Sequence, residues 1–174
     1  MSSQRVAELR HAFDSAFALT PSTERAQTDE VLAIRVGQDA YALRLTEVSG
    51  LIADKAITRL PASIPTLLGL MSSRGAIVSV YDLARLLGSS TDDAPRWVVL
   101  TAADPTIGLA FEHFDGFMRV PQDAIAVEET SAPRHSHAWG VVRIAETVRP
   151  IVSIPSVVDE IKVRVRNEML QKER

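Results

Sequence analysis

The fold of this chain is decided by residues 57–83, which contain Ile57-Thr58-Arg59-Leu60-Pro61 and, further on, Gly69-Leu70-Met71-Ser72-Ser73-Arg74-Gly75-Ala76-Ile77-Val78-Ser79-Val80-Tyr81-Asp82-Leu83. Their order predicts a strand, a proline stop, a short linking segment, an Arg-Gly turn, a hydrophobic strand and a helix capped by Asp82. Apolar and β-branched residues flank the turn, as buried strands require. Arg74 therefore sits where its charge can reach water or a partner, and nothing in the stretch indicates reaction chemistry.

On both sides of this stretch the sequence predicts short strands. Residues 31–36 and 41–45 are expected to pair as a hairpin around Gly37. Further strands are expected at Val48–Ile52, Ala56–Leu60, Ala76–Tyr81, Trp97–Thr101, Ile107–Phe111, Gly116–Val120, Ile125–Val127, Gly140–Ile144 and Val148–Val152. Short strands with frequent turn signals indicate an all-β barrel or sandwich rather than alternating βαβ units. One short internal helix is expected to run from Asp82 to a left-handed stop at Gly88.

The two ends of the chain have helical patterns. Apolar residues recur at helical spacing near the start, and Thr20-Pro21 ends that pattern before a polar linker. The members of this stripe are Val6, Leu9, Phe13, Ala16 and Phe17. We therefore divide the chain into an N-terminal helix and linker at 1–29, a central domain at 30–155 and a C-terminal helix at 156–174.

For the C-terminal segment two interpretations compete. Ser156 and Asp159 have capping-box spacing, and an apolar stripe follows at Val158, Ile161, Val165 and Met169. The alternation of residues 161–166 with period two is instead typical of a strand. The cap and the continuation to residue 174 favour the helix.

Composition excludes several classes of function. The chain has 174 residues, of which 46% are hydrophobic and 24% are charged, and its net charge is −3. This balance argues against a disordered acidic chain and against a general nucleic-acid binder. The absence of cysteine excludes disulfides, thiol catalysis and cysteine-based zinc sites. No apolar run approaches the roughly 18 residues of a membrane span, so we expect a cytoplasmic protein without direct membrane insertion.

In the order of its motifs, the segment from about residue 30 to about residue 155 resembles the CheW-like domain family, the coupling module of chemotaxis. The family opens with an apolar strand, a Gly-containing turn and an aromatic-bearing strand, which 31–36, Gly37 and 41–45 match. An Ile-Thr-x-Leu/Ile-Pro element follows, matched by Ile57 to Pro61. The family signature Gly-x-x-Asn-Leu-Arg-Gly-x-x-x-Pro-x-x-Asp-Leu corresponds to Gly69 to Leu83.

This resemblance implies an all-β fold of two small SH3-like five-stranded β-barrel subdomains, to which the terminal helices are added. The region 69–88 is expected to span between the two barrels. The resemblance also implies no catalysis and no cofactor. It implies a non-catalytic adaptor that bridges the regulatory domain of a chemotaxis-type histidine kinase and the cytoplasmic tip of a chemoreceptor, and that is recruited to receptor arrays.

The chain departs from the family pattern at three places. Ser72-Ser73 replaces Asn-Leu, Ser79 replaces the usual proline, and Gly50 stands where many members carry a Glu. That Glu belongs to the receptor-binding surface in the family. Because Arg74 is retained, the departures indicate a divergent paralogue with a restricted set of partners.

The expected partner-binding residues lie in the first half of the domain. Arg74 is expected to contact a partner, and the alternative is that it locks its own turn through backbone carbonyls. Leu51, Ile52 and Leu70 are the candidates for the kinase contact. The remaining candidates are Val48 and Gly50.

The competing functional class is a small-barrel metalloprotein or hydrolase. His135 and His137 could form a metal-binding pair, with His113 or Glu112 as a third ligand. A strong zinc signature needs more matched ligands than this, and the sequence has no nucleophile elbow, phosphate-binding loop or His-Glu-x-x-His. We therefore expect no metal and no catalytic residue.

Overall fold

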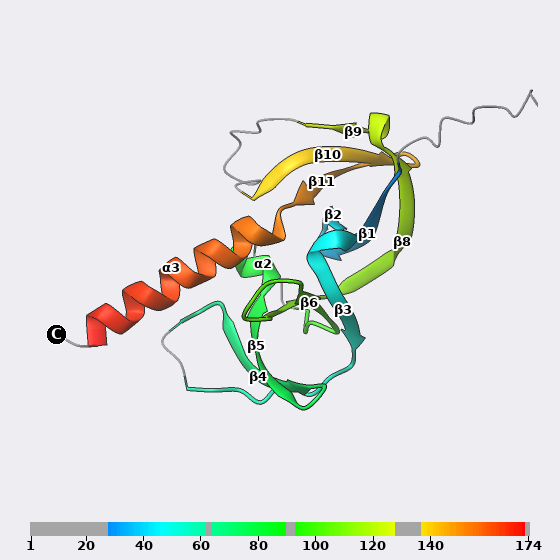
Figure 1. Ribbon diagram of the computed structural model, residues 1–174. Helices are drawn as coiled ribbons and strands as arrows, with labels where there is room; N and C mark the ends of the chain where they lie inside the picture. The colour runs from blue at the N-terminus through cyan, green and yellow to red at the C-terminus, as the bar shows by residue number, and fades with distance from the viewer. Residues whose placement is uncertain (1–27, 62–63, 90–92, 128–136, 173–174) are drawn as a thin grey trace, which may run out of the picture.

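A computed structural model describes residues 28–61, 64–89, 93–127 and 137–172 (Figure 1). The strands form two sheets, which confirms the all-β expectation. The predicted N-terminal helix lies outside the described residues.

The first sheet combines strands from the beginning and the end of the domain. Its spatial order is β8-β1-β2-β11-β10-β9, in which β2 and β11 pair in parallel and all other neighbours are antiparallel. The strands are β1 (Thr28–Val36), β2 (Asp39–Arg44), β8 (His113–Pro121), β9 (Ile125–Ala126), β10 (Ala138–Ile144) and β11 (Thr147–Val152). The two-residue β9 corresponds to the expected strand Ile125–Val127, and it gives this sheet six strands where the resemblance implies five.

The second sheet has five strands, the number that the resemblance implies, and is continuous in sequence. Its order is β3-β6-β7-β5-β4, with only β5 and β7 parallel. The strands are β3 (Val48–Ala53), β4 (Leu67–Ser73), β5 (Ala76–Asp82), β6 (Trp97–Thr101) and β7 (Gly108–Phe111). The helical elements are η1 (Leu45–Glu47), α2 (Leu83–Leu86), η2 (Gln122–Ala124) and α3 (Ile154–Lys172).

The chain passes between the sheets at short connections. It enters the second sheet through η1 and leaves it at Glu112, the only residue between β7 and β8. Glu112 is buried, and its carboxylate accepts a hydrogen bond from the backbone N–H of Gly37 at 3.0 Å. The second subdomain is therefore an insertion between β2 and β8 of the first.

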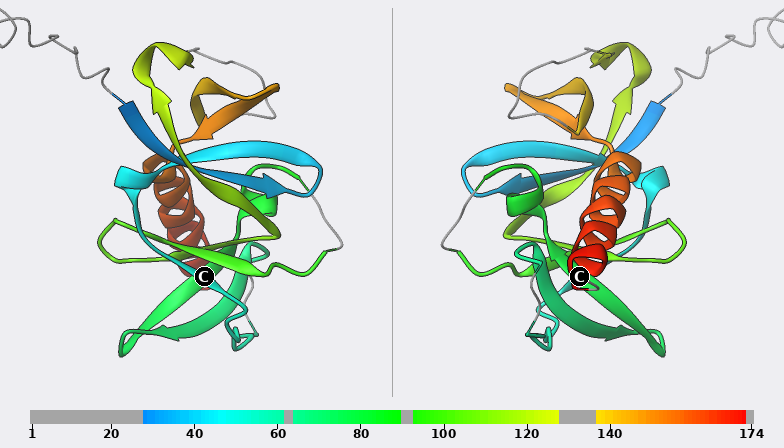
Figure 2. Two further views of the ribbon diagram at one scale, coloured as in Figure 1. Left: turned by 90° about the vertical axis from the view of Figure 1, so that its right-hand side faces the viewer. Right: turned by 90° about the vertical axis from the view of Figure 1, so that its left-hand side faces the viewer.

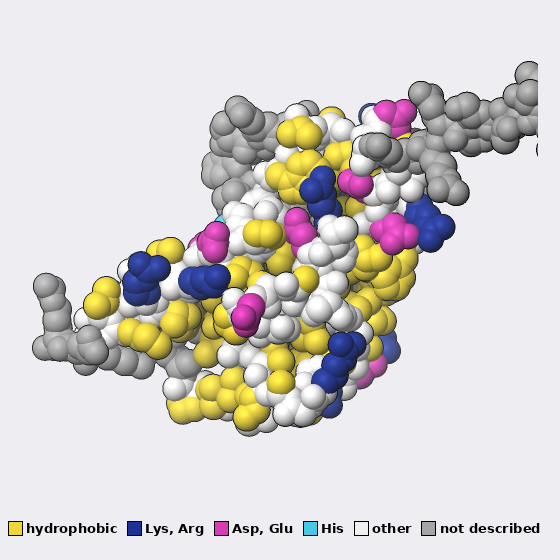
Figure 3. All heavy atoms as spheres, in the orientation of Figure 1, with side chains coloured by type: hydrophobic (Ala, Val, Ile, Leu, Met, Phe, Trp, Pro, Cys, Tyr) yellow, Lys and Arg dark blue, Asp and Glu magenta, His cyan; other side chains and the backbone are white. Residues whose placement is uncertain are grey.

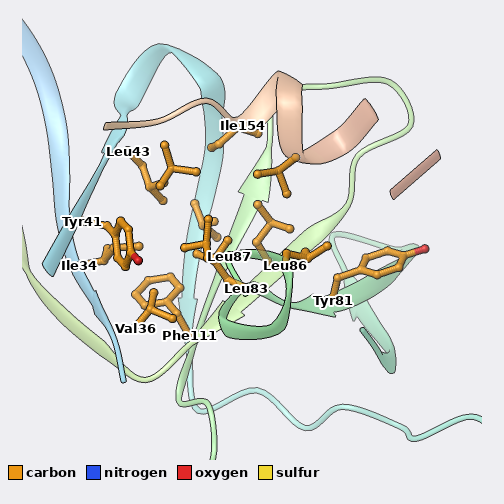
Figure 4. Packing of buried hydrophobic residues seen from close by; sticks show 14 of the residues in the cluster. Ile34, Val36, Tyr41, Leu43, Tyr81, Leu83, Leu86, Leu87, Phe111 and Ile154 are labelled. Atoms are coloured by element: carbon orange, nitrogen blue, oxygen red, sulfur yellow. The ribbon is translucent and has the colours of Figure 1, made fainter. Parts of the chain in front are cut away.

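The largest hydrophobic cluster joins both sheets. Figure 4 shows side chains of β1 and β2 converging with Phe111 of β7 and with α2. Asp82 caps α2 by accepting a hydrogen bond from the N–H of Arg85 at 3.2 Å, as predicted. Of the region 69–88, β4 and β5 belong to the second sheet, and Tyr81 at the end of β5, α2 and Leu87 contribute to the shared core. Its fully or nearly fully buried members include Leu32, Ile34, Leu43, Leu83, Leu109, Phe111, Ile154 and Val157.

The predicted strand Ala56–Leu60 is wrong. Only Thr58 pairs, through two backbone hydrogen bonds of 2.8 and 2.9 Å with Leu70. The strand register of β4 shifts between Leu67 and Gly69, and Pro61 has no N–H to donate, so the ladder does not extend. Conversely, residues 67–73 form the strand β4, where a linking segment was expected.

The C-terminal helix is confirmed, but its expected cap is wrong. The helix begins at Ile154, and Ser153 accepts a hydrogen bond through its Oγ from the N–H of Ser156 at 3.3 Å. Glu47 supplies a second acceptor, because its carboxylate receives the N–H of Ile154 at 2.8 Å. Burial raises the pKa of Glu47, against the opposing effects of this hydrogen bond and of Arg44. No helix among the described residues is long and apolar enough to cross a membrane.

A buried arginine holds four strands of the first sheet together. Arg149 of β11 donates to the carbonyls of Ile34 and Tyr41 at 3.0 and 3.5 Å, and to the carboxylate of Asp115 in β8 at 2.7 Å. Arg35 of β1 also donates to Asp115, at 3.2 Å. Desolvation acts to raise the pKa of Asp115, but the hydrogen bonds from Arg149 and Arg35 outweigh it and lower that pKa.

Candidate partner-binding site

The tip of the β4–β5 hairpin presents the one charged residue that the sequence singled out. Ser73 pairs with Ala76, so the loop consists of Arg74 and Gly75 alone. Both have positive φ, 50° and 81°, which is the conformation of a two-residue type I′ turn. This turn matches the twist of the strands beside it, and it fixes where the tip lies relative to the sheet.

The side chain of Arg74 is exposed and makes no hydrogen bond or ion pair with any described residue. It therefore does not lock its own turn. Next to it, Ile77 of β5 is 77% exposed, opposite Ser72 in β4. A free guanidinium and an exposed branched apolar side chain together form a surface that can bind a partner with both a carboxylate and an apolar group.

The candidates Val48, Leu51 and Ile52 in β3 are more buried than Arg74 and Ile77. Val48 and Leu51 pack against the large shared cluster, whereas Ile52 packs against the smaller cluster inside the second sheet. All three are partly buried. Leu51 and Ile52 therefore lie on opposite faces of the strand and do not form one patch.

The remaining candidates, Gly50 and Leu70, differ in how much space surrounds them. A Cβ at Gly50 would lie 3.5 Å from a methyl group of Leu100, an ordinary contact, so a side chain fits there. Leu70 is partly buried, and its backbone is already paired with Thr58. The structure thus places Arg74 and Ile77 at the tip of the β4–β5 hairpin, whereas the β3 candidates lie at the other end of the strand order.

An apolar groove of about 330 Å³ runs along α3. Figure 1 shows this helix projecting away from the two sheets. Tyr81 and Ile107 line one wall, and Val165 and Met169 of α3 line the other. Burial raises the pKa of Tyr81. The predicted α3 stripe accounts for this groove: Val158 and Ile161 are buried at its base, while Met169 is 64% exposed at its outer end.

Two exposed apolar residues, Ile77 and Phe117, were missed in the sequence. Ile77 lies within the apolar run Ala76-Ile77-Val78, where composition alone cannot tell the outward face from the inward one. The strand register set by the Arg74-Gly75 turn determines that Ile77 faces outward. Phe117 is 62% exposed on β8 and lies 5.3 Å, centroid to centroid, from Phe114.

The histidines do not form a metal site among the described residues. His137 is buried; its Nδ1 lies 2.9 Å from the Oγ of Ser156, and its Nε2 contacts the carboxylate of Glu160, both residues of α3. The ring therefore ties the residue before β10 to α3. His113 is exposed at the start of β8, and His135 lies outside the described residues.

Comparison with known proteins gives one family. The family model described as "CheW-like domain" matches residues 30–162. The chain is 24% identical over 137 residues to "Chemotaxis protein CheW" of Thermotoga maritima, covering 78% of this chain and 91% of that protein. It is also 24% identical over 136 residues to "Probable chemotaxis protein CheW" of Rhizobium etli, covering 75% and 88%.

A solved structure has the same fold. The scaffolding protein TtCheW from Thermoanaerobacter tengcongensis superposes with a TM-score of 0.67 at 15% identity, over 74% of this chain and 90% of that one. At this identity the likeness establishes the fold alone. It confirms the expected arrangement of two SH3-like β subdomains followed by a C-terminal helix.

Proposed function

Because this chain belongs to the CheW-like domain family, whose members are non-catalytic scaffold proteins of chemotaxis, we propose that it couples a chemotaxis-type histidine kinase to chemoreceptors. The chain is not an enzyme. The proposed partners are the regulatory domain of the kinase and the cytoplasmic tip of the receptor, in a bacterial two-component pathway. In this role the protein works in the cytoplasm and is recruited to receptor arrays.

The observation that supports this proposal most directly is the hairpin tip with Arg74. A stable turn does not require an arginine at this position, since the exposed side chain makes no hydrogen bond or ion pair with a described residue. A guanidinium presents several donors in a fixed geometry, and it binds a carboxylate through two parallel hydrogen bonds. We assign Arg74 to a carboxylate or to carbonyl groups of a partner, with Ile77 as the apolar contact beside it.

The test is the substitution Arg74→Ala. The free energy of unfolding should change by less than about 1 kcal/mol, because the site is exposed. Binding to the kinase regulatory domain or to a receptor-tip fragment should weaken at least tenfold, which corresponds to about 1.4 kcal/mol. Both affinities are measured by calorimetry. Arg143→Ala is the matched control, since Arg143 is an exposed arginine in the first sheet. Wild-type affinity of Arg74→Ala for both partners would reject the assignment.

The kinase contact at Leu51, Ile52 and Leu70 stays a prediction, and the geometry changes how it is best probed. These side chains are partly buried, so substitution by Asp would disturb folding as well as binding. Ile77→Asp is the clearer probe, because its side chain is exposed. If Ile77 lies at the centre of an interface, this change should cost about 2 kcal/mol or more of binding.

We further propose that the chain is a divergent paralogue with restricted partners. Gly50 stands where many family members carry a receptor-facing Glu, and the site has room for a side chain. We expect the wild type to bind kinase fragments and to bind receptor fragments weakly, and Gly50→Glu to strengthen receptor binding. Gly50→Ala controls for the backbone change. Tight wild-type binding to both partners would show that Gly50 does not restrict them.

The division of the chain at residues 29 and 155 also stays a proposal. The match of the family model from residue 30 supports the first boundary. The helix α3 begins at Ile154, two residues before the proposed second boundary.

A further inference from the structure

Three aromatic rings form a continuous row that ends on the surface of β8. Trp97 lies 5.1 Å from Phe114, and Phe114 lies 5.3 Å from Phe117 in an edge-to-face arrangement, both measured between ring centroids. Residues three apart in a regular strand point to opposite faces. Here the pairing with β1 slips by one residue, so that Ala33 faces Gly116 and Ile34 faces Phe114. This bulge at Asp115 brings Phe114 and Phe117 onto the same face.

The last ring of the row borders a cleft. Phe117 is 62% exposed, and the cleft beside it, about 410 Å³, is also lined by Val31, Leu45 and Met118. The ion pair between Glu30 and Arg119, at 2.8 Å, closes its rim. In Figure 3 hydrophobic side chains gather over β8 and β3 on the right-hand side of the molecule. An exposed Phe beside an apolar hollow does not contribute to the core, so it is available to another segment.

The described chain begins next to this cleft. Thr28, the first residue of β1, pairs with Pro121 at the end of β8, and Leu32 pairs with Phe117. In the left-hand view of Figure 2, β8 crosses the front of the molecule and β1 starts beside it, near η1. Four residues of strand separate Thr28 from the level of Phe117, a distance of about 13 Å.

The segment that precedes Thr28 has the length and the pattern to cover this face. Its predicted helix over residues 2–19 would be about 27 Å long, close to the roughly 30 Å of a nine-residue strand such as β8. One side of that helix carries Val6, Leu9, Phe13 and Phe17. The eight linker residues 20–27 can span up to about 28 Å, twice what is needed to turn back to Phe117.

We propose that residues 1–27 of this chain dock in cis on the aromatic face of β8, with their apolar stripe against Phe117 and the adjoining cleft. An amphipathic helix laid into an apolar groove is a common mode of recognition. Tethering to β1 raises the effective concentration of the segment at this face, so that a modest apolar contact suffices to hold it there. This docking is independent of the coupling function proposed above.

The absence of cysteine makes the test direct. A nitroxide is attached to Ser15→Cys of the full chain, on the side of the predicted helix opposite the stripe, and amide signals are recorded by NMR. Signals of β8 and η1 should lose more than half of their intensity, and those of the Arg74-Gly75 turn should be unchanged. Phe13→Asp in the labelled chain should restore the β8 signals, whereas His11→Asp on the other side of the helix should not.

Substitution on the docking face gives the complementary test. Phe117→Ser should restore the β8 signals, and Val148→Ser, which changes an exposed apolar residue of β11, should not. Signal loss along the α3 groove instead of β8, or no loss that depends on Phe13, would overturn the proposal. So would an equal loss in a mixture where the nitroxide and the isotope are on different molecules, because the contact would then be with a second copy.

Discussion

Among single residues, Gly69 marks the closest approach between two segments of the second subdomain. Its φ is 149°, and a Cβ built there would lie 2.1 Å from the carbonyl oxygen of Thr58. Any side chain must therefore push the Thr58 segment away from β4 and break the two hydrogen bonds to Leu70. The glycine serves backbone geometry rather than recognition.

We predict that Gly69→Ala lowers the free energy of unfolding by about 2 kcal/mol or more, from the clash and from the unfavourable backbone conformation. The measurement is urea denaturation followed by circular dichroism. Gly50→Ala is the matched control, because its new methyl group would make only an ordinary contact with Leu100. Equal stability of the two variants would show that the Thr58 segment moves aside without cost.

Asp115 gives the protein a defined response to acid. Its pKa in the folded state lies below the ordinary value of 3.8, so its charged form stabilises the fold at higher pH. This stabilisation is present above about pH 4 and is lost as the pH falls through the lower, folded-state pKa.

We therefore expect the free energy of unfolding to decline steeply below about pH 4 in the wild type and less steeply in Asp115→Asn. Denaturant titrations at several pH values measure both slopes. Asp159→Asn, at an exposed position on α3, is the control and should keep the wild-type slope. If Asp115→Asn follows the wild-type curve, the links to Arg149 and Arg35 contribute nothing to the acid response.

At the scale of elements, the N-terminus of α3 depends on a residue more than a hundred positions earlier in the chain. Glu47 of η1 accepts the N–H of Ile154, which has no partner within the helix. Glu47→Ala should cost about 1 to 2 kcal/mol, the range for loss of a helix cap. Glu47→Gln keeps an oxygen acceptor and should lose clearly less. Thermal and urea unfolding of the two variants decide this, and equal losses would contradict the capping role.

The sequence predicts elements well where the signal is local. The turn at Arg74-Gly75, the cap at Asp82 and the left-handed stop at Gly88 follow from residue types that few other conformations favour, and all three are confirmed. The predicted C-terminal helix is also confirmed, although its N-terminus is capped by Ser153 and by the distant Glu47.

Elements whose state depends on distant partners could not be predicted in the same way. Residues 56–60 have strand-like composition, but β4 accepts only Thr58 as a partner. Residues 67–73 contain a glycine and two serines, yet pairing with β5 makes them a strand. For the candidate site, sequence identified Arg74, but the exposure of Ile77 and Phe117 depends on a turn register and on a bulge.

At the scale of the whole molecule, the shared core makes the two subdomains depend on each other. The large cluster takes residues from both sheets, α2 and α3, so neither sheet keeps its interior when the other opens. Each sheet also contains one tryptophan, Trp97 in β6 and Trp139 in β10.

The variants Trp97→Phe and Trp139→Phe thus report the two halves separately through the fluorescence of the tryptophan that remains. In each variant, the unfolding midpoint seen by fluorescence should coincide with that seen by circular dichroism, as expected for a single cooperative transition. Two separated midpoints would show that the subdomains unfold one at a time.

The insertion of one subdomain into the other also sets the order in which the fold can be completed during synthesis. The second sheet is finished once residue 111 has left the ribosome, whereas β2 must wait for residues 147–152 before its parallel neighbour β11 exists. Until then the β1–β2 hairpin keeps an unpaired edge and an open apolar face, the kind of surface that invites wrong pairing. Completion of the first sheet is therefore the late, vulnerable step of biosynthesis, and the already folded insert holds the two ends of that sheet close together while it occurs.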